Sequence, residues 1–279
     1  MTHPLPDSLA SCVSLPTGGR LPWVGLGVYR VPEGLAGVAV VQEALRQGYR
    51  HVDTARIYGN EREVGEAVRS LALPRGDVFV TSKVWNDDHG YDATLRAVEG
   101  SLERLGLGPL DLMLVHWPVA GLRRETWRAL ERCREDGMVR AIGVSNYMVH
   151  HLEELTVHAN EPPAVNQIEV HPFLQQREVR SWCQKQGVIV EAYSPLVKAR
   201  RMDHPVLLEV SRAVDRSPAQ VLLRWGLEHG LVVLPKTVSA ERMAENAQLF
   251  GWTLGPDLME RLDGLEEGAV TGWDPRQMP

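Results

Sequence analysis

The chain has 279 residues and a formal net charge of −6, with 44% hydrophobic and 24% charged residues. This composition is typical of a globular protein. The acidic balance argues against nucleic acid as a partner, because binding a phosphate backbone requires a basic face. A single small phosphorylated ligand stays compatible, since it needs only a few local cations.

The three cysteines, Cys12, Cys133 and Cys183, are far apart in the sequence and odd in number. They form no CxxC pair, so the pattern indicates neither a zinc cage nor a disulfide framework, and no metal is expected. The first residues lack the cationic start of a signal peptide, and no apolar run approaches the roughly 18 residues of a membrane span. We therefore expect a cytoplasmic protein without a membrane partner.

The first predicted element is a hairpin, in which residues 12–15 and 21–24 flank a turn signal at Thr17-Gly18-Gly19. After it, short apolar runs alternate with segments of helical period. The predicted strands are 24–27, 50–53, 78–83, 112–116, 141–145, 165–169, 188–193 and 232–235. The predicted helices are 36–47, 61–71, 91–105, 125–136, 150–158, 177–186, 219–228, 240–249 and 257–265.

Eight strand–helix units without a break in composition predict an α/β fold, a single (β/α)₈ TIM barrel over residues 1–279. An N-terminal β-hairpin and a short C-terminal helix and tail complete it, and an open doubly wound sheet is the alternative. Residues 195–214 are predicted to form a long loop at the carboxyl ends of the strands. Arg200 and Arg201 in this loop fit two interpretations equally well, attraction of an anionic substrate and plain exposure.

Polar side chains stand at the ends of successive predicted strands. They are Asp53, Lys83, His116, Ser145 with Asn146, Gln167 and Tyr193. Because a barrel arranges its strand ends around one rim, we expect these side chains to face a common pocket. Each has an ordinary structural explanation when taken singly, such as a solvated ion pair or a buried histidine. Their occurrence in successive units favours a functional site.

The stretch 48–61, with Asp53 at the end of a strand and Tyr58 in the following turn, resembles the aldo-keto reductases, NADPH-dependent carbonyl reductases built on a (β/α)₈ barrel. Nearly the whole chain shares the resemblance. Other matching motifs are Lys83, His116-Trp117-Pro118, Gly143-Val144-Ser145-Asn146, and Leu234-Pro235-Lys236 with Arg242 and Glu245-Asn246. The nearest types are the prokaryotic 2,5-diketogluconate and methylglyoxal reductases. The resemblance implies a catalytic tetrad of Asp53, Tyr58, Lys83 and His116.

These residue types suit hydride delivery to a carbonyl carbon, which leaves negative charge on the oxygen and requires a proton donor. A free tyrosine has a pKa near ~10, which we expect the Lys83 ammonium to lower. Asp53 would supply the counter-charge that a buried Lys83 needs. His116 would donate a hydrogen bond to the carbonyl oxygen, and Tyr58 would be the general acid.

The cofactor assignment also follows from the resemblance, because the Gly25–Arg30 run lacks the third glycine of a Rossmann fingerprint. The family implies NADPH extended across the barrel rim. The implied contacts are Gly27, Ser145, Asn146, Gln167, Tyr193, Ser194, Leu196, Lys236, Thr237, Arg242, Glu245 and Asn246. Lys236, Thr237 and Arg242 match the positions that hold the adenosine 2′-phosphate. Ser239 stands where many relatives have another basic residue, which weakens, without reversing, the case for NADPH over NADH.

The resemblance also implies Tyr29, Trp85 and Trp117, with His116, as walls of the substrate pocket, although barrel packing explains aromatic residues there too. The tail after Gly268 is short. We therefore expect an open pocket for small aldehydes, 2-oxo-aldehydes or keto-sugar acids, in a protein that the family suggests is a monomer.

Two other functions fit parts of the sequence. His51, Asp53, His116 and His171 resemble the dispersed ligands of a metal-dependent barrel hydrolase, but the first strand has no His-x-His and Lys83 would have no role. A non-catalytic NADPH-binding regulatory or structural protein on the same fold is the other alternative. The complete tetrad argues against it.

Overall fold

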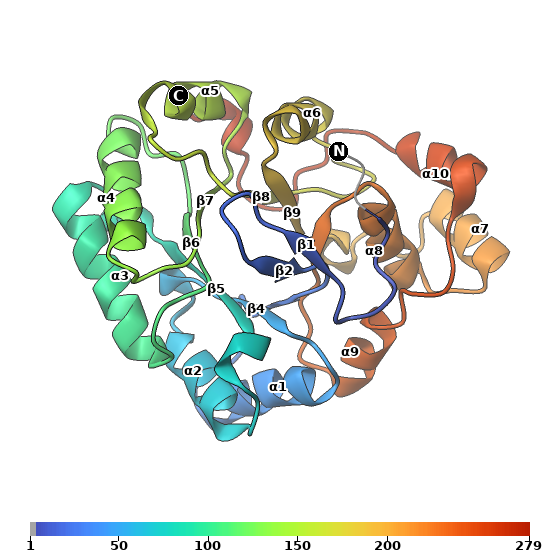
Figure 1. Ribbon diagram of the computed structural model, residues 1–279. Helices are drawn as coiled ribbons and strands as arrows, with labels where there is room; N and C mark the ends of the chain where they lie inside the picture. Colours follow the sequence, from blue (N-terminus) through green and yellow to red (C-terminus); the bar gives the residue numbers. More distant parts are fainter. Residues whose placement is uncertain (1–3) are drawn as a thin grey trace.

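The computed structural model describes residues 4–279. Two antiparallel strands, β1 (Cys12–Ser14) and β2 (Arg20–Pro22), form the predicted hairpin. Its turn requires glycine, because φ is 87° at Gly18 and 92° at Gly19. Only three residues separate β2 from the first barrel strand, so the hairpin lies at the amino ends of the strands. Figure 1 shows it crossing the middle of the ring of helices.

Eight parallel strands form one sheet in chain order. They are β3 (Leu26–Gly27), β4 (His51–Asp53), β5 (Phe79–Val84), β6 (Leu112–Val115), β7 (Ile142–Ser145), β8 (Val165–Glu169), β9 (Ile189–Tyr193) and β10 (Val232–Leu234). The sheet closes on itself, because Val24 forms a parallel bridge with Val233 and the Gly27 amide donates to Pro235 O at 3.0 Å. The predicted (β/α)₈ barrel is thus confirmed, and the open sheet is wrong.

Helices surround the barrel. They are α1 (Leu35–Arg46), α2 (Glu61–Ser70), α3 (Tyr91–Leu105), α4 (Arg123–Glu135), α5 (Val149–His158), α6 (Arg177–Gln186), α7 (Pro205–Val214), α8 (Pro218–Glu228), α9 (Ala240–Asn246) and α10 (Gly255–Asp263). Helices outside the barrel and side chains inside it leave β5 to β8 buried along their whole length. Of the buried polar residues on these strands, Lys83, Ser145 and Gln167 are candidate site residues, whereas Thr81, Ser82, Asn166 and Glu169 are not.

Two predicted boundaries need correction. The long loop predicted for 195–214 contains helix α7, which starts with Pro205 at its first turn and buries Leu207 and Val210 at a spacing of three. Helix α9 ends at Asn246, three residues before the predicted end. Leu249, in the segment after the helix, is fully buried although it is not helical. An apolar residue at this position therefore does not indicate that the helix continues.

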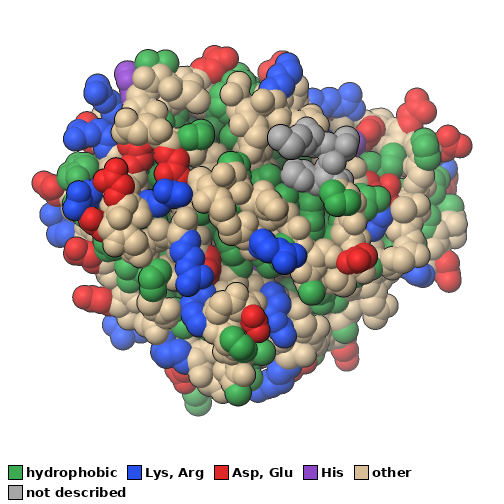
Figure 2. All heavy atoms as spheres, viewed as in Figure 1, with side chains coloured by type: hydrophobic (Ala, Val, Ile, Leu, Met, Phe, Trp, Pro, Cys, Tyr) green, Lys and Arg blue, Asp and Glu red, His purple; other side chains and the backbone are tan. Residues whose placement is uncertain are grey.

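The surface carries charges of both signs. On the face shown in Figure 2, Lys and Arg side chains are interspersed with Asp and Glu and form no continuous basic surface. No helix among residues 4–279 has both the length and the apolar character needed to cross a membrane. Cys12, Cys133 and Cys183 are all free thiols.

Candidate active site

A buried ion pair lies where β4 and β5 end. Lys83 Nζ is 2.6 Å from Asp53 Oδ1 and donates a second hydrogen bond to Thr54 O at 2.9 Å. Burial lowers the pKa of Lys83, but Asp53 and Tyr58 raise it, and the balance lies above the ordinary value. Lys83 is therefore a charged ammonium at neutral pH, and Asp53 supplies its counter-charge.

Tyr58 lies beside this ion pair, at the end of the 3₁₀ turn Arg56–Tyr58. Its phenol oxygen is 3.4 Å from Lys83 Nζ, and Gly59 ends the turn with a φ of 75°. Burial raises the pKa of Tyr58 and Lys83 lowers it, with the balance above the ordinary value. The expected effect of Lys83 thus has the right direction, but burial outweighs it. The phenol keeps its proton at neutral pH.

His116 follows β6 and faces Tyr58. The two rings are 5.8 Å apart and nearly perpendicular, and the Trp85 ring is 5.1 Å from the imidazole. Burial, and then the Lys83 charge, hold the pKa of His116 well below its ordinary value. The ring is therefore neutral, with one N–H to donate and one nitrogen to accept. The structure thus brings the four expected tetrad residues together.

Aromatic rings from separate parts of the chain surround these polar groups. The Tyr29 ring is 5.0 Å from Tyr58. Trp273, in the C-terminal tail, lies 6.3 Å from Trp85 and 5.6 Å from Trp117. Trp85 therefore lies beside His116, Trp117 packs on Trp273, and the role of both as substrate walls stays a prediction. Trp273 packs against both of these residues, a contact that sequence reasoning missed, because no local pattern reveals where a tail packs.

The tail is held in place by polar contacts. The Thr271 amide donates to Glu169 Oε1 at 3.0 Å, and Lys198 Nζ donates to Thr271 O at 2.7 Å. Arg201 forms an ion pair with Glu267. Arg201 therefore has a structural partner in the tail, whereas Arg200 is exposed and has none among residues 4–279. The tail thus folds back against Trp85 and Trp117, and the open pocket expected from its short length stays a prediction.

The expected carboxamide ligands form one hydrogen-bonded group. Asn146 Nδ2 donates to His116 O at 3.0 Å and to Ser145 Oγ at 3.1 Å, and Tyr193 OH donates to Asn146 Oδ1 at 2.7 Å. Ser145 Oγ donates to the backbone oxygen of Gln167 at 2.9 Å. The Asn146 amide is therefore fully bonded within the protein, which fixes its position beside His116.

The side chain of Gln167 has one free end. Its Nε2 donates to Asp53 Oδ2 at 2.8 Å and to Glu191 Oε2 at 2.9 Å, while Oε1 makes no hydrogen bond within the described chain. A flipped amide would direct its oxygen at the Asp53 carboxylate, so this orientation is the favourable one. Gln167 thus offers a ligand only an acceptor, which suits the N–H₂ of a carboxamide.

A group of cations lies after β10. Lys236 and Arg242 are exposed, Thr237 is buried, and Arg30 lies close to Lys236. Partial burial and the Arg30 charge lower the pKa of Lys236. None of the three cations forms an ion pair with an acid in residues 4–279, so the group is suited to an anionic ligand. Arg30 was missed by sequence reasoning, although it directly follows Tyr29.

The other expected cofactor residues lie on the same strands and helix. Gly27 ends β3, and a Cβ there would lie 3.9 Å from Lys236 Cβ. Ser194 follows β9 with a φ of 49°, and Leu196 is partly buried against the core. Glu245 and Asn246 end α9, in which Ser239 accepts the Arg242 amide at 3.3 Å. Ser239 therefore serves as a helix cap.

The residues that suggested a metal site have other partners. His51 Nε2 is 3.1 Å from Thr81 Oγ1, and burial lowers the pKa of His51 to about 3. His171 Nε2 is 3.2 Å from Glu169. Within residues 4–279 no three His, Cys, Asp or Glu side chains gather as ligands of one metal ion. The geometry therefore gives the metal-dependent alternative no support.

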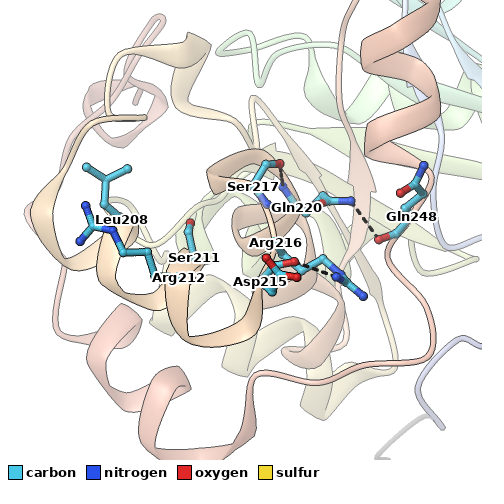
Figure 3. A pocket seen from close by; sticks show the side chains of 8 residues that line it. All are labelled: Leu208, Ser211, Arg212, Asp215, Arg216, Ser217, Gln220 and Gln248. Atoms are coloured by element: carbon cyan, nitrogen blue, oxygen red, sulfur yellow. Dashed lines mark hydrogen bonds between the residues drawn. The ribbon is translucent and has the colours of Figure 1, made fainter.

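A separate pocket of about 450 Å³ opens between α7, α8 and the segment after α9 (Figure 3). Its lining residues are Leu208, Ser211, Arg212, Asp215, Arg216, Ser217, Gln220 and Gln248. Ser217 caps α8 by accepting the Gln220 amide, and the Gln220 side chain donates to Gln248 O at 3.3 Å. None of the expected site residues lines this pocket.

Comparison with known proteins agrees with the geometry. The model of the Aldo/keto reductase family matches residues 36–267. The uncharacterized oxidoreductase YtbE of Bacillus subtilis is 47% identical over 271 residues, which cover 96% of this chain and 97% of that protein. The glyoxal reductase of Bacillus subtilis is 46% identical, with 98% and 99% covered. A mutant of Gox0644, solved in complex with NADPH, has a TM-score of 0.91 and 40% identity, with 96% and 98% covered. The chain belongs to the aldo/keto reductase family.

Proposed function

We propose that the protein reduces small aldehydes and ketones, 2-oxo-aldehydes and keto-sugar acids in particular, to alcohols by hydride transfer from NADPH, with Tyr58 as the general acid. The observation that carries the proposal is the Tyr58 phenol 3.4 Å from the charged Lys83, which Asp53 holds at 2.6 Å. A buried phenol beside an ammonium is a proton donor whose conjugate base is stabilised. Family membership and the glyoxal reductase relative support carbonyl reduction.

Several residues act on the carbonyl oxygen, each in a different role. Tyr58 gives its proton to that oxygen as negative charge develops there, and Lys83 stabilises the phenolate that is left. Neutral His116 donates a hydrogen bond to the same oxygen and orients the substrate. Tyr29, Trp85, Trp117 and Trp273 bind the apolar part of the substrate and exclude water.

NADPH fits the residues present, and it supplies the hydride when it is bound. The free acceptor of Gln167 suits its carboxamide, and the Tyr193 ring suits its nicotinamide. The cations Lys236, Arg242 and Arg30, for which residues 4–279 contain no ion pair with an acid, suit its phosphates. Two structural relatives, the Gox0644 mutant and the aldo-keto reductase AKR2E5, are solved as NADPH complexes.

The direct test is the loss of nicotinamide absorbance when the protein is mixed with methylglyoxal, once with NADPH and once with NADH. Faster oxidation of NADPH is expected. Comparable rates of NADPH and NADH oxidation would support carbonyl reduction but contradict a 2′-phosphate site at Lys236 and Arg242. No oxidation of either cofactor across a panel of small aldehydes would refute the proposed activity and favour a non-catalytic role.

Removing two cations should raise KM for NADPH more than KM for NADH. Lys236→Ala combined with Arg242→Ala is expected to raise KM for NADPH by at least about tenfold, because each charge-assisted hydrogen bond contributes about 1.5–3 kcal/mol. KM for NADH, which lacks the 2′-phosphate, should change less than about threefold. Steady-state kinetics with both cofactors measures the difference, and equal effects would show that these cations do not read the phosphate.

Trp273 should matter more for large substrates than for small ones. Trp273→Ala removes one aromatic wall, so KM for an aromatic aldehyde such as benzaldehyde is expected to rise about tenfold through lost apolar contact. Turnover of methylglyoxal should change little. Trp252→Ala is the matched control, since Trp252 contacts Arg216 and Arg224 away from these walls. Equal losses for both aldehydes would place Trp273 outside the substrate pocket.

Cellular location and assembly are part of the proposal. Three free cysteines and a net charge of −6 suit a reducing cytoplasm and a protein without nucleic-acid partners. All four groups of the expected tetrad come from one chain. We therefore propose a cytoplasmic monomer that acts on a small carbonyl substrate.

A further inference from the structure

One buried acid in the barrel interior has no part in the proposed mechanism. Glu191 lies on β9, is 0% exposed, and stands opposite Gln167 of β8 in the strand register. Glu191 Oε2 and Asp53 Oδ2 accept from the same nitrogen, Gln167 Nε2, at 2.9 and 2.8 Å. A single amide therefore joins Glu191 to the ion pair beside Tyr58.

The groups around Glu191 supply no cation of its own. From β4, Asp53 is an acid, and His51, whose Nε2 is 3.7 Å from Glu191 Oε1, is neutral because burial lowers its pKa to about 3. From β5, Lys83 is already paired with Asp53. Two carboxylates that share one cation and one amide cannot both be charged at low cost.

The remaining neighbours do not change this balance. On β10, Val232 stands opposite Glu191, and on β8 the next acid, Glu169, is bonded to His171 and Thr271. Burial and the Asp53 charge raise the pKa of Glu191 to about 8, against the opposing effects of Gln167 and Lys83. At neutral pH the cluster thus contains one carboxylate, one ammonium and one protonated acid.

We propose that Glu191 is a positioning residue of the reductase, which holds a proton at neutral pH and, through Gln167, keeps Asp53 aligned on Lys83 beside Tyr58. The inference rests on the proposed function and deepens it. Because Glu191 is uncharged, Lys83 has one carboxylate to pair with. Because Gln167 Nε2 is held between two acceptors, its Oε1 stays available to a ligand.

Loss of the Glu191 proton changes both arrangements. A second negative charge then attracts Lys83 and repels Asp53, and it destabilises the phenolate that Tyr58 leaves after giving up its proton. Reduction should therefore slow as pH rises through about 8. Neither Tyr58, whose pKa lies above its ordinary value, nor neutral His116 titrates in that range.

The first experiment needs neither cofactor nor turnover. Side-chain NMR of isotope-labelled glutamate in the cofactor-free protein, followed against pH, should show one carboxyl that titrates near pH 8. Glu191→Gln should lose that signal. The matched control Glu131→Gln, which changes a buried acid of α4 bonded to Asn160, should keep it. A wild-type protein in which every glutamate titrates below about pH 6 would overturn the proposal, whether or not the variant folds.

The second experiment tests whether Glu191 positions the catalytic groups or only stabilises the fold. For the wild-type protein and Glu131→Gln, kcat for methylglyoxal should fall about tenfold between about pH 7 and about pH 9, as one proton is lost. Glu191→Gln, which cannot ionise, should keep a flat profile over that range. An unchanged fall in Glu191→Gln would overturn the inference alone. A protein with the titrating carboxyl but no carbonyl reduction would overturn the proposed function and, with it, the positioning role.

Discussion

Tyr58→Phe is expected to lower kcat for aldehyde reduction by about 10²–10⁴-fold, the range that a positioned general acid contributes. The ring keeps its contacts with Tyr29 and His116, so the Kd for NADPH should stay within about twofold. Only the hydroxyl, whose oxygen lies 3.4 Å from Lys83 Nζ, is removed. Single-turnover kinetics gives the chemical step, and fluorescence titration gives Kd.

The matched control for this change is Tyr147→Phe. Tyr147 is fully buried, whereas Tyr58 is partly buried, and the Tyr147 ring packs against His151 of α5, away from the tetrad. Its variant should keep normal turnover. If Tyr58→Phe also kept near-normal turnover, the acid would be another group, and the proposed mechanism would be wrong.

Lys83→Met is expected to destabilise the fold by about 3–5 kcal/mol, because it leaves the buried Asp53 carboxylate without its cation. Removing the second charge as well should restore part of that stability, so the double variant Lys83→Met with Asp53→Asn should be more stable than Lys83→Met alone. Urea unfolding of the two single variants and the double variant measures this coupling. Activity should stay lost in all three.

The outcome that would contradict this prediction is additivity. If the two single changes simply summed in the double variant, the 2.6 Å contact would contribute nothing as a pair. Arg128→Ala is a useful reference, since the exposed Arg128–Glu125 pair on α4 should contribute little.

The barrel is readable from the sequence because its strands are short and helices separate them, one α-helix in most units and two, α7 and α8, between β9 and β10. The strand ends at Asp53, Lys83 and His116 are fixed by the same pattern, so their meeting at one rim follows from the fold. The sequence did not reveal helix α7, because basic residues precede it and Pro205 is its first residue. A proline at the first turn of a helix looks like a loop signal until Leu207 and Val210 are seen to be buried.

Contacts between distant segments account for what the sequence could not reveal. Trp273 approaches Trp85 in a tail that Thr271 anchors to Glu169, and no local pattern records that contact. Glu191 did leave a trace, an acid in the middle of an otherwise apolar predicted strand. Its meaning depends on the strand opposite, where Gln167 supplies the shared amide.

The closure of the barrel also sets how the chain must acquire its structure. Val24 meets Val233, about two hundred residues later, so the last seam joins segments that are among the most distant in the sequence. Contacts between residues so far apart in the sequence form late and slowly. Until β10 has left the ribosome, β3 and β9 present unpaired edges that can join another chain. Productive folding of this protein therefore requires that synthesis be completed before those two strand edges lead to aggregation.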